Sequence, residues 1–151
     1  MTNKTVILKN KLNEDIQRLQ KAIKSFRKSF EICKRIGIKD EFSFEEEESF
    51  DSLTSKFSRI SDVYIQKVLK TALLLKREDW GSTIDMINKC EKISLINSAE
   101  DVLMIRDLRN SIVHEYAEDI IKEIYSDTLE LSEKLIINVN DSIDTLRKDY
   151  I

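Results

Sequence analysis

The 151-residue chain contains no proline and only two glycines, Gly37 and Gly81. Average usage is about 5% proline and 7% glycine, so an all-β sandwich or barrel would lack its turn residues. Apolar residues are plentiful and regularly spaced, which argues against disorder. The sequence therefore predicts long helices joined by few turns. The length fits one helical domain over residues 1–151.

Two long segments carry apolar residues at steps of three and four. The first runs from Leu8 to Cys33, where one helical face persists for about seven turns, and Gly37 follows as a predicted C-cap. The second runs from Phe50 to Leu75 and stops near residues 80–82. At 1.5 Å per residue each helix would be about 40 Å long, and two such helices with a short link pack antiparallel.

Three further helices are predicted downstream. Residues 83–93 form a short helix with Ile84, Ile87 and Cys90 facing inward. A capping-box pattern at residues 98–101 opens a helix over about 99–114. A last helix spans about 118–147, with a kink or break at residues 126–127. The predicted fold is all-α, an up-and-down four-helix bundle with one additional short helix.

The net charge of −3 is unevenly spread. Residues 1–39 hold eleven Lys and Arg against three acids, whereas residues 40–51 hold seven acids and no base. The basic first helix fits either a phosphate-facing surface or a solvated face. The overall acidity argues against a general nucleic-acid binder, and no DNA partner is predicted.

Cysteine and histidine usage bounds the chemistry. Cys33 and Cys90 lack CxxC spacing, so both are predicted to be reduced and buried. One histidine cannot complete a Cys/His zinc site, and adjacent helical acids at 45–48 point in four directions, so no metal site or cofactor is predicted. No signal peptide or membrane span is evident, and a cytoplasmic protein without a membrane partner is expected.

The segment RDLRNSIVHEY at residues 106–116 carries the residue types that suit RNA cleavage. His114 is the side chain whose ordinary pKa of about 6.5 permits proton transfer near neutrality. Arg109 supplies a fixed positive charge for a developing phosphorane. Asn110 suits either an RNA contact or a bracing role. In an ideal helix Arg109 and His114 lie about 140° apart, so either the helix loosens before Glu115 or the site draws on residues from elsewhere.

The pattern R-x4-H-x-Y, formed by Arg109, His114 and Tyr116 with Asn110 after the arginine, resembles the HEPN superfamily of helical ribonucleases and, within it, the HepT-like toxins. The helix order agrees with that family from about residue 10 to 147, and residues 56–70 resemble its second helix more weakly. The resemblance implies a metal-independent endoribonuclease, the toxin of a type VII-like toxin–antitoxin pair. It also implies a minimal nucleotidyltransferase antitoxin that blocks the toxin by transferring AMP to Tyr116.

The single histidine bears on the oligomeric state. Cleavage by the 2′-hydroxyl route is best served by one base and one acid, but a monomer offers one imidazole. A two-fold dimer would bring two copies of His114 and Arg109 to one cleft, and the resemblance implies the same arrangement. A homodimer with RNA as substrate is therefore predicted.

Other interpretations stay open at this stage. The chain could be a non-catalytic helical partner of a nucleotidyltransferase, or a purely structural dimerisation bundle. His114 could be an ordinary surface or core histidine, and Tyr116 a half-buried cap on the helices' end. Arg59 and Asp62 share a helix face at i, i+3 as a surface pair or as supporting residues. Arg106 is predicted to pair with Asp107 or a neighbour.

Overall fold

A computed structural model describes residues 2–114 and 118–150, and all regular structure in these residues is helical. The all-α prediction is therefore confirmed. The helices are α1 (Asn3–Ile36), α2 (Phe44–Asp62), the π-helical segment η1 (Val63–Leu69), α3 (Lys70–Leu75), α4 (Thr83–Lys92), α5 (Ala99–His114) and α6 (Glu118–Tyr150). The segments α2, η1 and α3 follow one another without interruption, so they form one long helix.

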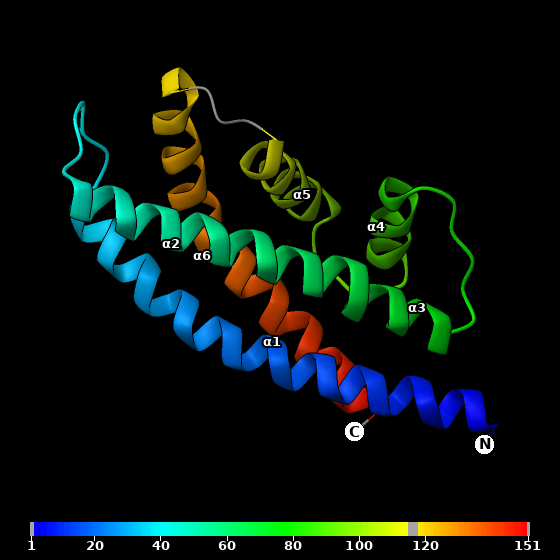
Figure 1. Cartoon of the computed structure of the whole chain (residues 1–151). Helices are drawn as coiled ribbons and strands as arrows, with labels where there is room; N and C mark the ends of the chain where they lie inside the picture. The colour runs from blue at the N-terminus through cyan, green and yellow to red at the C-terminus, as the bar shows by residue number, and fades with distance from the viewer. Residues whose placement is uncertain (1, 115–117, 151) are drawn as a thin grey trace.

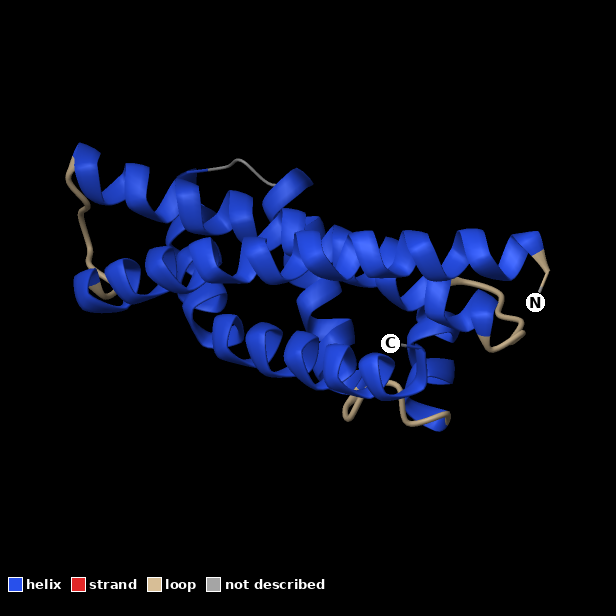
Figure 2. Ribbon diagram, turned by 90° about the horizontal axis from the view of Figure 1, so that it is seen from below, coloured by secondary structure: helices blue, strands red, loops and turns tan. Residues whose placement is uncertain are grey.

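The helices lie in two contacting pairs. Helices α1 and α2 run antiparallel, and α5 packs against α6 (Figure 1). Helix α2 contacts both α5 and α6, and α6 also contacts α1, whereas the short α4 packs on α5. The view from below shows the elongated arrangement that results (Figure 2). None of the helices described is both long and apolar enough to cross a lipid bilayer.

Buried apolar side chains from every helix form one shared core. Phe26, Phe50, Phe57 and Tyr64 are all fully buried. The Tyr64 hydroxyl lies 2.7 Å from the Ser142 hydroxyl and donates to the Asn138 carbonyl at 3.2 Å. These bonds satisfy a polar atom at the centre of the molecule, where an unpaired hydroxyl would be costly.

Both cysteines are free and buried, as predicted. Burial raises the pKa of the Cys33 thiol to about 11 and that of the Cys90 thiol to about 12. Both side chains therefore behave as small apolar groups in the core.

The ends of the helices are fixed by local hydrogen bonds. Gly37 ends α1 with φ 72° and ψ −179°, and its N–H donates to the Cys33 carbonyl at 2.9 Å, so the predicted C-cap is confirmed. Ser43 and Ser82 each begin a helix with a reciprocal capping box. Ser98 accepts from the Asp101 N–H at 3.1 Å, which is the forward half of the predicted box.

The π-helical segment reconciles an unusual spacing with the core. Ile60, Tyr64, Val68 and Ala72 are successive core residues four positions apart, and all are at most 1% exposed. In an α-helix each such step advances by about 40° beyond a full turn, so three steps would move the last side chain about 120° off the face. The wider turns of a π-helix hold all four residues against the core.

The predicted break at residues 126–127 and the inward position of Ile84 are wrong. Helix α6 runs unbroken through Ser126 and Asp127, because no proline or glycine interrupts it. The Thr128 and Ser132 hydroxyls bond to carbonyls four residues earlier, which bends a helix without ending it. Ile84 is 46% exposed rather than inward. The buried face of α4 is formed by Met86, Ile87 and Cys90, and Ile84 lies roughly 110° from its centre.

Candidate active site

Arg109 projects from α5 toward the end of α2, where three of its nitrogens meet oxygen atoms. Its Nη2 donates to Asp62 Oδ2 at 3.1 Å, and its Nη1 donates to Asn110 Oδ1 at 3.3 Å. Its Nε lies 2.7 Å from Asp62 Oδ1 as a charge contact without hydrogen-bond geometry. The Arg109 side chain is 29% exposed. The side chain is therefore held in one orientation with one edge open to a ligand.

Asp62 lines the candidate site and has a different partner from the one that the sequence suggested. Its carboxylate pairs with Arg109, which is 47 residues away in sequence, rather than with Arg59, whose side chain is exposed. Asp62 is the last residue of α2, directly before the π-helical segment. Single π-helical turns inside α-helices occur frequently at functional sites.

A polar cleft of about 230 Å³ lies beside this ion pair. It is enclosed by the α2–η1 junction, the start of α4 and one face of α5, and its lining residues are Ser61, Asp62, Ile65, Gln66, Thr83, Arg106, Arg109 and Asn110. Arg106 makes a 3.5 Å contact with Asp107, as predicted. The cleft thus combines two guanidinium groups, two amides and two hydroxyls around one carboxylate.

His114 lies at the end of α5 and is exposed. The helix stays regular through His114, so the 140° separation from Arg109 persists and the cleft beside Arg109 does not include the imidazole. Asn110 falls between them, about 40° from His114 and about 100° from Arg109 around the axis. The structure brings Arg109 and Asn110 together and leaves His114 on a neighbouring face. The predicted AMP acceptor, Tyr116, lies outside the described residues.

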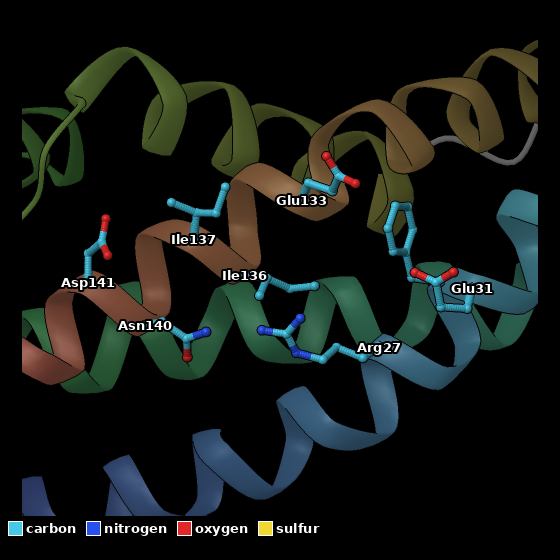
Figure 3. Close-up of a pocket in the computed structure, with 8 residues that line it drawn as sticks. Arg27, Glu31, Glu133, Ile136, Ile137, Asn140 and Asp141 are labelled. Carbon is cyan, nitrogen blue, oxygen red and sulfur yellow. The ribbon is translucent and has the colours of Figure 1, made fainter.

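Other clefts contain none of the predicted site residues. One of about 490 Å³ lies between α1 and α6, and its lining includes Arg27 and Glu31 of α1 and Glu133, Ile136 and Asp141 of α6 (Figure 3). Another lies between α2 and α6, where Tyr125 donates to Asp51 at 2.9 Å. Within residues 2–114 and 118–150, no group of three or more His, Cys, Asp or Glu is arranged to hold a metal ion.

Nothing in the sequence marked two of the residues that line the cleft as site residues. Ser61 and Gln66 are ordinary polar positions on an amphipathic helix, and only the fold places them beside Arg109. Asp62 did have a weak signal, because it lies within the segment that resembles the second helix of the HEPN family. Comparisons of this chain with protein-family models, with curated proteins and with solved structures found no match.

Proposed function

We propose that this chain is a metal-independent endoribonuclease of the HEPN type, acting as a toxin that a partner nucleotidyltransferase neutralises. The observation that carries the proposal is the clamped Arg109, fixed by Asp62 and Asn110 at the edge of a polar cleft. His114 follows on the same helix within one and a half turns. The four long helices and short α4 are consistent with the up-and-down HEPN bundle.

In the proposed chemistry the phosphoryl group of RNA is transferred from O5′ to O2′. A neutral imidazole removes the 2′-hydroxyl proton, O2′ bonds to phosphorus, and the bond from phosphorus to O5′ breaks. An imidazolium gives its proton to the departing O5′, which leaves a cyclic phosphate and a 5′-hydroxyl. Arg109 stabilises the negative charge that develops on the phosphorane oxygens.

The separation of His114 from the Arg109 cleft makes the homodimer part of this proposal. In one protomer the two side chains point about 140° apart, and one protomer offers a single imidazole, so it does not supply both the base and the acid to one phosphate. A two-fold axis near the end of α5 would place the His114 of the partner subunit opposite and supply the second imidazole.

The same separation favours a second candidate, a non-catalytic partner subunit of a nucleotidyltransferase. In that case the cleft would hold a nucleotide or phosphate without cleavage, and His114 would be an exposed helix-end residue.

Cleavage in the presence of EDTA tests the proposal. Purified protein is incubated with RNA, with His114→Ala and Arg109→Ala as test variants and Lys148→Ala, an exposed residue of the last turn of α6, as a control. We expect cleavage by the wild type and the control, and loss of at least about a hundredfold in both test variants. Absence of cleavage by the wild type would favour the partner subunit.

Modification of Tyr116 is tested by mass spectrometry after co-expression with the nucleotidyltransferase. We expect an added AMP on the peptide that contains Tyr116, and none with Tyr116→Phe. The phosphate adds negative charge and bulk beside the motif, so the modified protein should no longer cleave RNA.

A further inference from the structure

The cleft beside Arg109 contains a buried hydroxyl with no partner. Ser61 is 1% exposed, and its Oγ has no hydrogen-bond partner among the described residues. Ser58 Oγ, one turn earlier on α2, is also buried without a described partner, but Ser58 does not line the cleft and Ser61 does. The buried Thr128 and Ser132 hydroxyls each bond to the carbonyl four residues earlier. An unused buried polar atom needs an explanation, and an unfilled ligand position is one.

Arg106 is the available cation of this cleft. The charge of Arg109 is matched by Asp62, whereas Arg106 meets only Asp107, which is 75% exposed, at 3.5 Å. The Arg106 side chain is itself 31% exposed, and a contact of this length with a largely exposed neighbour on the same helix contributes little. The first residue of α4, Thr83, also lines the cleft and brings the positive end of that helix to its rim.

The size and remaining groups of the cleft restrict the ligand. A volume of about 230 Å³ is below the range of about 300–1,000 Å³ for drug-sized ligands, which suits a phosphate with its sugar. Gln66 and Asn110 offer amide donors and acceptors, and Ser61 offers a hydroxyl donor. Ile65 supplies an apolar wall.

We propose that this cleft binds the nucleotide next to the cleaved bond of an RNA strand, with its phosphate on Arg106 and an oxygen of its phosphate or sugar on the Ser61 hydroxyl. The assignment of this phosphate to an RNA strand rests on the proposed ribonuclease function. It adds a second phosphate subsite beside Arg109, in a cleft that His114 does not line.

Equilibrium binding of uridine 5′-monophosphate tests the subsite, with uridine as the ligand that lacks the phosphate and with ionic strength held constant. We expect the monophosphate to bind at least about tenfold more tightly than uridine. Arg106→Gln should weaken monophosphate binding by about tenfold, which corresponds to loss of one charged contact. Arg59→Gln removes an exposed arginine from α2 as a matched control and should change binding less than about twofold.

Ser61→Ala separates a binding role from a structural role. Removal of an unsatisfied buried hydroxyl should leave the melting temperature unchanged or raise it, while monophosphate binding falls several-fold. A lower melting temperature would mean that the hydroxyl supports the fold. Equal binding of monophosphate and uridine, or equal losses in Arg106→Gln and Arg59→Gln, would overturn the phosphate subsite.

RNA cleavage measured on the same preparations distinguishes the two proposals. Monophosphate binding with the expected variant pattern but no cleavage would overturn the ribonuclease and leave the nucleotide cleft standing. Cleavage without monophosphate binding would overturn the cleft alone.

Discussion

At the scale of single residues, the contact with Asp62 fixes both the charge environment and the orientation of Arg109. A guanidinium on a side chain that is only 29% exposed has lost much of its hydration, and the Asp62 carboxylate offsets that loss. The same contact fixes the orientation of the side chain, so little reorganisation is needed when negative charge develops nearby. Asp62 is therefore a positioning residue for Arg109.

Asp62→Asn should affect activity much more than stability. The pair is partly exposed, with 44% of the Asp62 side chain accessible, so we expect a loss of about 1 kcal/mol in the free energy of unfolding. Cleavage should fall by about tenfold or more because the guanidinium is no longer held. Urea denaturation and initial cleavage rates measure the two effects.

Asp144→Asn, an exposed change on α6, is the control for this pair of measurements. A double-mutant cycle of Asp62→Asn with Arg109→Gln should show non-additive losses. Additive losses would mean that the two residues act independently.

The buried thiols predict a pH dependence of stability. The pKa of Cys33 is raised to about 11 and that of Cys90 to about 12 in the fold, from an ordinary value near 9. The unfolded chain loses these protons first, so the stabilising contribution is complete below about pH 8.5 and is lost as the pH rises toward 11 and 12. The free energy of unfolding should fall with a steepening slope above pH 9.

Cys33→Ala with Cys90→Ala should flatten that slope, as measured by urea denaturation from pH 7 to pH 10.5. Tyr64 contributes a further decline at higher pH, because burial raises the pKa of its hydroxyl. An unchanged slope in the double variant would show that the thiols are not responsible.

Sequence reasoning reached the site residues on α5 but not their environment. The types and spacing of Arg109 and His114 are local information, whereas the contact of Arg109 with Asp62 depends on how α2 and α5 meet. Helical geometry correctly predicted that Arg109 and His114 diverge. It could not predict that Asn110 bonds to Arg109 rather than capping a helix.

At the scale of whole elements, the end of α1 depends on a backbone conformation. Gly37 combines φ 72° with ψ −179°, a region that only glycine occupies readily. A Cβ placed there would meet no atom within 4 Å. The requirement for glycine is therefore purely conformational.

Gly37→Ala should lower the free energy of unfolding by about 1–3 kcal/mol. Gly37→Asn should be no better, because asparagine tolerates the left-handed helical region but not this more extended one. Thermal or urea unfolding measures both, with Glu41→Ala in the same loop as a control. Recovery of stability by asparagine would contradict the backbone argument.

Helix existence and extent followed from the apolar spacing, because steps of three and four are a direct consequence of helical geometry. The π-helical segment also had a signal, since Ile60, Tyr64, Val68 and Ala72 are four residues apart three times in succession. The break predicted at residues 126–127 was wrong because two polar residues alone do not end a helix that packs along its length.

At the scale of the whole molecule, the arrangement of exposed groups bears on assembly. Val113, which is 37% exposed, lies next to the exposed His114 at the end of α5. An apolar side chain beside a proposed catalytic histidine suits a two-fold contact that shares the site.

We expect a mass in solution of twice the 17.7 kDa chain, measured by light scattering after size-exclusion chromatography. Val113→Glu should shift the mass toward the monomer and reduce cleavage together, because each site would lose the partner's imidazole. Ile7→Glu, at a 65% exposed position near the start of α1, should change neither the mass in solution nor the cleavage rate. A monomer that still cleaves RNA would contradict the shared site.

The long helix from Phe44 to Leu75 consists of two α-helical parts joined by the π-helical segment, which changes the rotation of one part relative to the other about the helix axis. Asp62, at the end of its first part, reaches toward α5, while all three of its parts contact α1. Conversion of Val63–Leu69 to α-helical turns of the same length would rotate everything beyond it about the helix axis. Ala72 and Leu73, which are fully buried, would then turn away from the core. The wide turns therefore make the direction of Asp62 and the burial of the distal part compatible within one continuous helix.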